Sequence, residues 1–187
     1  MLLKVIVGIL VLLYPVAVYY GLQVFEVKTL GILLLGVLVV RMFLSKASST
    51  KQLLLVSAGG VLLASIIVFT NDALYLKLYP VLMNVLMFLV FFTSLFRPPS
   101  VVERLARIRE PELDAHAVAY TRKVTMVWCV FFLMNGSVAL WTVLAGTMAQ
   151  WTLYNGLISY ILLGVLMAAE FVVRLWVKKH KGEIGNA

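Results

Sequence analysis

The segment FRPPSVVERLARIREPELDAHAVAYTRK, residues 96–123, is the only long polar segment in this chain. It contains six of the sixteen Lys and Arg residues and four of the eight Asp and Glu residues. Pro98 and Pro99 stop a helix that precedes them, because the residue before a proline avoids the helical conformation. Ser100 and Glu103 have the S-x-x-E spacing of a capping box, which marks a helix start. The segment therefore predicts the end of one long helix and the start of a short one.

The short helix is predicted to be amphipathic. Val101, Leu105 and Ile108 share one face, and arginines occupy the opposite side and the flanks. Directly after a membrane span, such a helix lies at the bilayer surface with its apolar stripe in the acyl boundary and its arginines near anionic headgroups. We therefore expect membrane lipids with anionic headgroups as partners. The residues expected to contact the headgroups are Arg97, Arg104, Arg107, Arg109, Arg122 and Lys123.

The chain as a whole is far more apolar than a soluble domain. Of its 187 residues, 63% are hydrophobic and 13% are charged, whereas a soluble domain has about 25% charged residues. This length holds about six spans of about 20 residues each. The predicted fold class is all-α, a single polytopic membrane helix bundle (residues 1–187) with about six transmembrane helices and a cytoplasmic amphipathic helix. The spans are predicted at 2–20, 29–44, 53–69, 76–96, 124–144 and 151–176, and the amphipathic segment at 97–123.

Lys and Arg residues are distributed unevenly between the two ends of the predicted spans. The connections 21–28, 71–78 and 146–150 contain only two of them, Lys28 and Lys77. The other fourteen basic residues fall on the opposite side. The positive-inside rule then predicts that both termini and the central polar segment are cytoplasmic. Because the net charge of +8 arises from short segments beside apolar spans, nucleic acid is not an expected partner.

Short motifs along the chain carry a family resemblance. They are the Asn71-Asp72 turn, the Arg97-Pro98 exit from a span, WCVFF at 128–132 with Gly136 after it, and Trp151 before the last span. Together with the order of the spans, they resemble bacterial intracellular septation protein A. The motifs YPVLMN at 79–84, RPP at 97–99, WTLYNGLISY at 151–160 and EFVVR at 170–174 resemble its membrane-protein relatives.

The resemblance implies a multi-span protein of the bacterial inner membrane, linked to envelope integrity and to the division or elongation machinery and without catalytic activity. Envelope or division proteins would then be partners. Septation proteins are drawn with about five spans, whereas this chain predicts about six. A bundle of about six small helices leaves much of its surface facing lipid. A second copy of the chain could pack against that surface, so a homodimer is a further possible partner.

Glu170 and Arg174 are the charged residues of greatest interest within a predicted span. They are four residues apart on the last helix, so they can pair on one face. One interpretation is a polar site that faces the interior of the bundle and takes a lipid headgroup or a proton. The other is that both residues lie near the cytoplasmic surface and extend toward the headgroups. The sequence leaves their depth open.

Uncharged polar residues form a second set within the predicted spans. They are Asn84, Asn135 and Asn155, together with Tyr79, Tyr154 and Tyr160. An asparagine in a span seeks a partner on another helix, and such bonds contribute about 0.6 to 2 kcal/mol. The asparagines therefore either hold helices together or line a polar cavity for a substrate. With Glu170 and Arg174, they make up the predicted intramembrane polar site.

Patterns that carry catalysis are absent from the sequence. Glu112, Asp114 and His116 alternate at a spacing of two, which puts them on different sides of a helix and argues against a metal site. Asp-rich prenyl-transfer motifs, glycine-rich phosphate loops and a nucleophile elbow do not occur. We therefore predict no catalytic residue, no metal and no cofactor.

Two hypotheses about function remain. The leading one is a non-enzymatic envelope protein that organises or senses lipid, or that scaffolds the division machinery. The rival is a transporter of a lipid or lipid-linked precursor, or a membrane accessory of lipid or polyene biosynthesis, with the intramembrane polar residues in a cavity. Charge reversal of Arg104 and Arg107 should abolish function in the first case, and Glu170→Gln should abolish it in the second.

Overall fold

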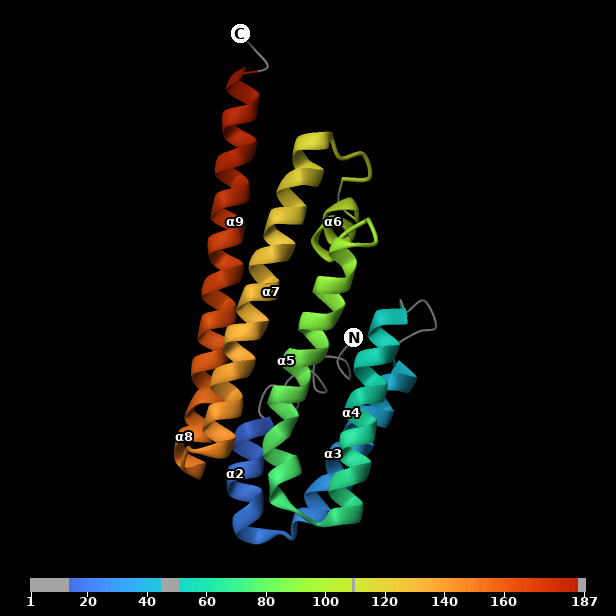
Figure 1. Cartoon of the computed structure of the whole chain (residues 1–187), viewed down its shortest axis with the longest axis vertical. Helices are drawn as coiled ribbons and strands as arrows, with labels where there is room; N and C mark the ends of the chain where they lie inside the picture. Colours follow the sequence, from blue (N-terminus) through green and yellow to red (C-terminus); the bar gives the residue numbers. More distant parts are fainter. Residues whose placement is uncertain (1–13, 45–50, 109, 185–187) are drawn as a thin grey trace.

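A computed structural model describes residues 14–44, 51–108 and 110–184, and these residues form helices and turns without any strand (Figure 1). The helices are α2 (Tyr14–Val24), α3 (Val27–Leu44), α4 (Lys51–Thr70), α5 (Ala73–Leu95), α6 (Val101–Arg107), α7 (Ala115–Leu144), α8 (Met148–Leu153), the π-helical turn η1 (Tyr154–Ile158) and α9 (Ser159–Ile184). The predicted all-α class is confirmed for this part of the chain.

Three helical stretches among the described residues are long and apolar enough to cross a membrane. They are α5, α7 and Met148–Arg174, which runs from α8 through η1 into α9. These stretches coincide with the predicted spans 76–96, 124–144 and 151–176. By the length and composition of these helices, the chain is a membrane protein.

The amino-terminal half contains shorter apolar helices. The predicted spans 29–44 and 53–69 coincide with α3 and α4, whose described apolar parts cover Val27–Val40 and Ala58–Thr70. Of the predicted span 2–20, only the part within α2 is described, and residues 1–13 lie outside the described residues.

The structure divides the predicted surface segment 97–123 into two parts. Only α6 and the turn after it lie outside the long helices, because α7 already begins at Ala115. The Asp114 carboxylate caps α7 by accepting a hydrogen bond of 2.7 Å from the backbone N–H of Ala117. No proline or glycine follows in residues 115–123, so nothing in this stretch opposes a helix. Arg122 and Lys123 therefore belong to α7.

The helices α5 and α7 pack side by side along much of their length, and the hairpin of α3 and α4 packs against α5 (Figure 1). Gly136 on α7 lies at the point where α5 carries Asn84. A Cβ atom at Gly136 would be 3.0 Å from the Cβ atom of Asn84, so a larger side chain there would push the two helices apart. The glycine thus allows the close approach that brings polar side chains of α5 and α7 together.

The main apolar core lies where α2, α3, α4, α5, α8 and the end of α7 meet. Ile67 and Leu76 are fully buried in it, and so is Trp151 of α8. The Nε1 atom of Trp151 donates a hydrogen bond of 3.0 Å to the backbone carbonyl of Lys77. This bond fixes α8 against the start of α5 and anchors the base of the last long helix.

The long helix α9 behaves differently from α5 and α7. Its contacts are concentrated at η1, and most of its described apolar side chains beyond that turn are exposed, including Ile161, Val165 and Val172. Apolar side chains on the outside of a membrane-spanning helix face acyl chains. The α9 surface is therefore available to lipid.

The two ends of the bundle carry different kinds of connection. The α2–α3, α4–α5 and α7–α8 connections lie together at one end, and α6 and the end of α9 lie at the other (Figure 1). At the first end, the side chain of Asn71 accepts a hydrogen bond of 2.8 Å from the backbone N–H of Lys28. Asn71 has a φ of 51°, a left-handed conformation that asparagine tolerates. The turn predicted at Asn71-Asp72 is confirmed.

Candidate functional site

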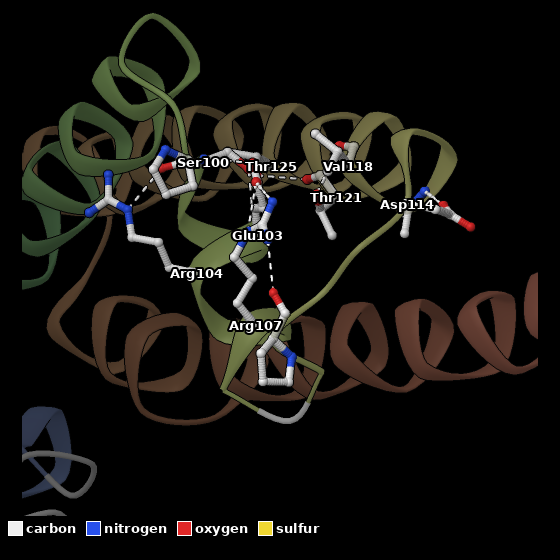
Figure 2. A network of polar contacts seen from close by, with 11 residues as sticks. Ser100, Glu103, Arg104, Arg107, Asp114, Val118, Thr121 and Thr125 are labelled. Carbon is white, nitrogen blue, oxygen red and sulfur yellow. Dashed lines mark hydrogen bonds and ion pairs between the residues drawn. The ribbon is translucent and has the colours of Figure 1, made fainter.

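A buried polar network joins α6 to α7 (Figure 2), and a hydrogen bond to Ser94 connects it to α5. The Ser100 Oγ atom accepts a hydrogen bond of 3.4 Å from the backbone N–H of Glu103, and the Glu103 carboxylate accepts one of 3.3 Å from the backbone N–H of Ser100. The predicted capping box is therefore formed. Because α6 has only seven residues, it is too short to be stable alone and depends on such bonds.

Hydroxyl groups of the two neighbouring helices extend this network. The Ser94 Oγ atom on α5 accepts a hydrogen bond of 3.1 Å from the backbone N–H of Val101. On α7, Thr125 Oγ1 lies 3.2 Å from Ser100 Oγ and donates a hydrogen bond of 2.8 Å to the carbonyl of Thr121. All these hydroxyl side chains are buried. Ser100 was predicted from its capping spacing, but Ser94 and Thr125 were not, because single Ser and Thr residues in an apolar helix carry no signal of their position.

Glu103 and Arg107 form an ion pair within α6. The carboxylate oxygen Oε1 of Glu103 accepts two hydrogen bonds from Arg107, of 2.7 Å from Nη2 and 3.0 Å from Nε. The Nη1 atom of Arg107 donates a third hydrogen bond, of 3.0 Å, to the carbonyl of Pro111. Glu103 is only 6% exposed. The pair thus holds α6 and the following turn in place, which the sequence analysis did not foresee.

The apolar residues of α6 occupy different environments, because Val101 at its start packs against Leu86 and Val90 of α5. Leu105 and Ile108 are 60% and 78% exposed, whereas Glu103 and Ala106 are buried against the neighbouring helices. The predicted apolar face of Val101, Leu105 and Ile108 is therefore divided: Val101 packs inward, whereas Leu105 and the C-cap residue Ile108 are exposed.

The basic residues predicted to contact headgroups occupy different environments. Arg97, Arg122 and Lys123 are exposed. Arg104 is half-buried, and its Nε atom donates a hydrogen bond of 2.8 Å to the carbonyl of Pro99. The guanidinium of Arg107 is held by Glu103 and the Pro111 carbonyl, as described above. Arg109 lies outside the described residues.

A second polar region lies deeper in the bundle, in a cleft of about 190 Å³ between α2, α5, α7, η1 and the start of α9. Asn84, Asn135 and Asn155 all line it, so the structure brings together the three asparagines that the sequence indicated. Tyr160 also lines the cleft, and no residue of the lining that the structure describes is charged. Hereafter we call this region the asparagine cleft.

A chain of hydrogen bonds connects three helices at the asparagine cleft. The Nδ2 atom of Asn84 donates a hydrogen bond of 2.9 Å to the carbonyl of Pro80. Because a carbonyl only accepts, this bond fixes which end of the Asn84 amide is nitrogen. Asn84 Oδ1 then accepts a hydrogen bond of 3.0 Å from Asn135 Nδ2, and Asn135 Oδ1 accepts one of 2.9 Å from the Tyr154 hydroxyl. The chain runs from α5 through α7 to η1.

Asn155 is oriented in the same way by a backbone carbonyl. Its Nδ2 atom donates hydrogen bonds of 2.9 Å to the Trp151 carbonyl and 3.2 Å to Thr142 Oγ1. Both amide hydrogens are therefore used. Asn155 is only 3% exposed, and within the described part of the chain its Oδ1 atom accepts no hydrogen bond. One acceptor of a buried side chain at the cleft is left with spare capacity.

The π-helical turn η1 contains both Tyr154 and Asn155. Such turns inside longer helices occur frequently at functional sites, because they redirect side chains. The backbone of Gly156 in the same turn lies against α2, since a Cβ atom there would be 3.3 Å from Val16. No signal in the sequence predicts this turn.

Glu170 and Arg174 do not belong to the asparagine cleft. No ion pair joins these two residues in the described part of the chain, so the predicted pair is not formed. The Tyr120 hydroxyl donates a hydrogen bond of 3.4 Å to the carbonyl of Glu170, which sets Glu170 level with the second turn of α7. Glu170 therefore lies at the same end of the bundle as α6, and its depth in a membrane stays a prediction.

A search of the described residues finds no group of His, Cys, Asp and Glu side chains that could hold a metal ion. His116, Glu112 and Asp114 are exposed there. Comparisons of the chain with protein-family models, curated proteins and solved structures found no match. The fold and its polar regions thus define an all-helical membrane protein, and the resemblance to septation protein A rests on its sequence motifs.

Proposed function

We propose that the chain is a six-span protein of the bacterial inner membrane, with both termini in the cytoplasm. It acts without catalysis in the organisation of the cell envelope, and its basic end binds anionic lipid headgroups. The observation that carries this proposal is the exposure of Leu105 on α6 and of Ile108 at its C-cap, at the end of helices long enough to cross a bilayer. The motifs that resemble septation protein A support the link to the envelope.

The orientation of α6 favours contact with the bilayer surface. Full burial of a leucine or isoleucine side chain contributes about 1.5 to 3 kcal/mol. The exposed residues Arg97, Arg122 and Lys123 lie at the same end of the bundle. Each basic side chain near an anionic surface adds about 1 kcal/mol. The burial of apolar side chains and the attraction of basic side chains to anionic lipid therefore both favour binding of this end to the membrane surface.

The network beneath α6 supports a preformed surface element. Ser100, Glu103 and Thr125 are buried, and each has hydrogen-bond partners. A helix held in this way loses little conformational freedom when it meets the membrane, so less of the binding energy is lost to ordering. The contact with lipid is thus made by a surface that the protein itself holds in shape.

The depth of α6 can be measured with a fluorescent label in liposomes. Leu105→Cys and Glu112→Cys are made in a Cys129→Ala background, since Cys129 is the single cysteine. Brominated lipids should quench a label at position 105 and not one at position 112, which is exposed in the turn after α6. Equal quenching by a water-soluble quencher at both positions would contradict the proposal.

The choice of headgroup is a separate readout. Protein in mixed vesicles of phosphatidylglycerol and phosphatidylcholine should retain the anionic lipid preferentially through purification. Arg97→Glu with Arg122→Glu should remove this preference, and added salt should weaken it, because exposed charges are screened. These residues are better targets than Arg104 and Arg107, since reversal at Arg107 would also break the pair with Glu103. Unchanged retention would count against headgroup binding at this end.

The rival hypothesis, a protein that carries or processes a lipid, is favoured by one observation. A cleft lined by three asparagines, with no charged residue in the part of its lining that the structure describes, lies between α5, α7 and the start of the last long helix. Polar groups at such a position are the usual mark of a ligand site in membrane proteins. Glu170 and Arg174 lie outside it, so the rival hypothesis rests on the asparagines alone.

A further inference from the structure

We propose that the asparagine cleft binds an uncharged lipid whose headgroup is a hydroxyl, such as a long-chain or prenyl alcohol. This site is distinct from the headgroup-binding end around α6, and it does not depend on the function proposed for that end. The two sites would recognise opposite features of a lipid, namely a negative charge at α6 and the lack of one in the cleft.

The polar atoms of the cleft match a hydroxyl group. Asn155 Oδ1 is an acceptor without a partner in the described part of the chain, and its orientation is fixed because Nδ2 faces the Trp151 carbonyl. Tyr160 also lines the cleft, and none of the hydrogen bonds within the described part of the chain involves its hydroxyl. A ligand hydroxyl both donates and accepts. It can therefore donate to Asn155 and accept from Tyr160.

A charged headgroup does not fit this lining. Among the described residues, no lysine, arginine, aspartate or glutamate borders the cleft, so the charge of a phosphate, amine or carboxylate would find no counter-ion among them. Burying an unpaired charge among membrane helices is strongly unfavourable. The lining therefore selects for a neutral molecule.

The remaining walls of the cleft suit a hydrocarbon chain. Met83, Met87, Phe132 and Leu163 supply flexible and flat apolar surface. The cleft of about 190 Å³ is smaller than the roughly 300 to 1,000 Å³ of pockets that enclose a whole small molecule. It holds the headgroup and the first carbons, and the rest of the chain lies along the exposed apolar surface of α9. Water alone would satisfy Asn155 but would leave these apolar walls wet.

Photo-crosslinking of the protein in liposomes tests the proposal. The probe is a long-chain alcohol with a diazirine near its headgroup and a terminal alkyne, and the matched probes carry a carboxylate or an amine in place of the hydroxyl. We expect the alcohol to label peptides that contain Met87 or Leu163. We also expect an excess of unmodified alcohol to compete with it, and the charged probes to label these peptides at least about tenfold less.

Tyr160→Phe removes one hydroxyl and keeps the ring, so it should lower labelling by about three- to tenfold, the effect of one hydrogen bond. Met87→Trp, which fills the cleft, should abolish labelling. The matched control is Tyr20→Phe, because Tyr20 is exposed on α2 and does not line the cleft. Thermal unfolding in detergent confirms that each variant is folded.

Two results would overturn the proposal. One is labelling that is spread over the lipid-facing surface and is not competed by the alcohol, which indicates that water alone fills the cleft. The other is equal labelling by the carboxylate or amine probe. Neither result bears on anionic headgroup binding at α6, which is measured with a different lipid at the other site.

Discussion

The buried network of Ser94, Ser100, Glu103 and Thr125, here called the junction, and the asparagine cleft are both built from buried polar side chains. The two regions differ in how many of their polar atoms have a hydrogen-bond partner. At the junction, the Glu103 carboxylate accepts from Ser100 and Arg107, and Thr125 bonds to the Thr121 carbonyl. At the cleft, the buried Asn155 keeps an acceptor without a partner in the described part of the chain. A completed network stabilises architecture, whereas spare capacity beside a cavity suits a ligand.

The largest effect should come from the ion pair at the junction. Arg107→Ala leaves the buried carboxylate of Glu103 without its partner and should lower the free energy of unfolding by about 3 kcal/mol. Arg174→Ala is the matched control, since Arg174 has the same spacing from Glu170 but forms no ion pair with it in the described chain. It should change stability by less than about 0.5 kcal/mol. Unfolding in mixed micelles titrated with dodecyl sulfate measures the free energy of unfolding of both variants. Equal decreases in the two variants would contradict the claim that only the Glu103–Arg107 pair stabilises the fold.

A smaller effect is expected from the hydroxyl at the α6–α7 contact. Thr125→Val keeps the shape of a fully buried side chain and removes the group next to Ser100, at a cost of about 1 to 2 kcal/mol. Thr93→Val is the control, because Thr93 makes a similar bond, to the Leu89 carbonyl, but is exposed. The same titration measures the free energy of unfolding of both variants. If Thr93→Val lowered it as much as Thr125→Val, the stability effect would not depend on the contact with Ser100.

The smallest effect should appear at the cleft. A double-mutant cycle of Asn84→Ala and Asn135→Ala should give a coupling energy of about 0.6 kcal/mol and not above about 1.7 kcal/mol, the range measured for bonds between membrane helices. A coupling of several kcal/mol would mean that the asparagines are primarily structural. That result would make the cleft resemble the junction and weaken its assignment as a ligand site.

Local features of this chain followed from its sequence. The capping box at Ser100 and Glu103 and the turn at Asn71 depend on residues a few positions apart, so their spacing was sufficient to predict them. The apolar stretches of α5 and α7 were evident from hydropathy. The early start of α7 was missed, because the polar residues 115–123 resemble a loop in composition while nothing in them opposes a helix.

Features that depend on neighbouring helices were only partly accessible. The sequence contains two pairs with the spacing Glu-x-x-x-Arg, and it drew attention to Glu170 and Arg174 because they lie in an apolar stretch. The pair that forms is Glu103–Arg107, since the surroundings of α6 bury the carboxylate. The three asparagines were predicted as a group, but their common cleft depends on Gly136 and on η1. Neither the close helix approach at Gly136 nor the π-helical turn η1 can be recognised in the sequence.

The most direct test of the difference between the two polar regions is a crystal structure of the protein grown in a lipidic mesophase that contains a long-chain alcohol. Our account predicts electron density in the asparagine cleft, with an oxygen atom within hydrogen-bonding distance of Asn155 Oδ1, and an unchanged network around Ser100. A cleft closed by protein side chains, with Asn155 Oδ1 bonded to another residue of the chain, would contradict it.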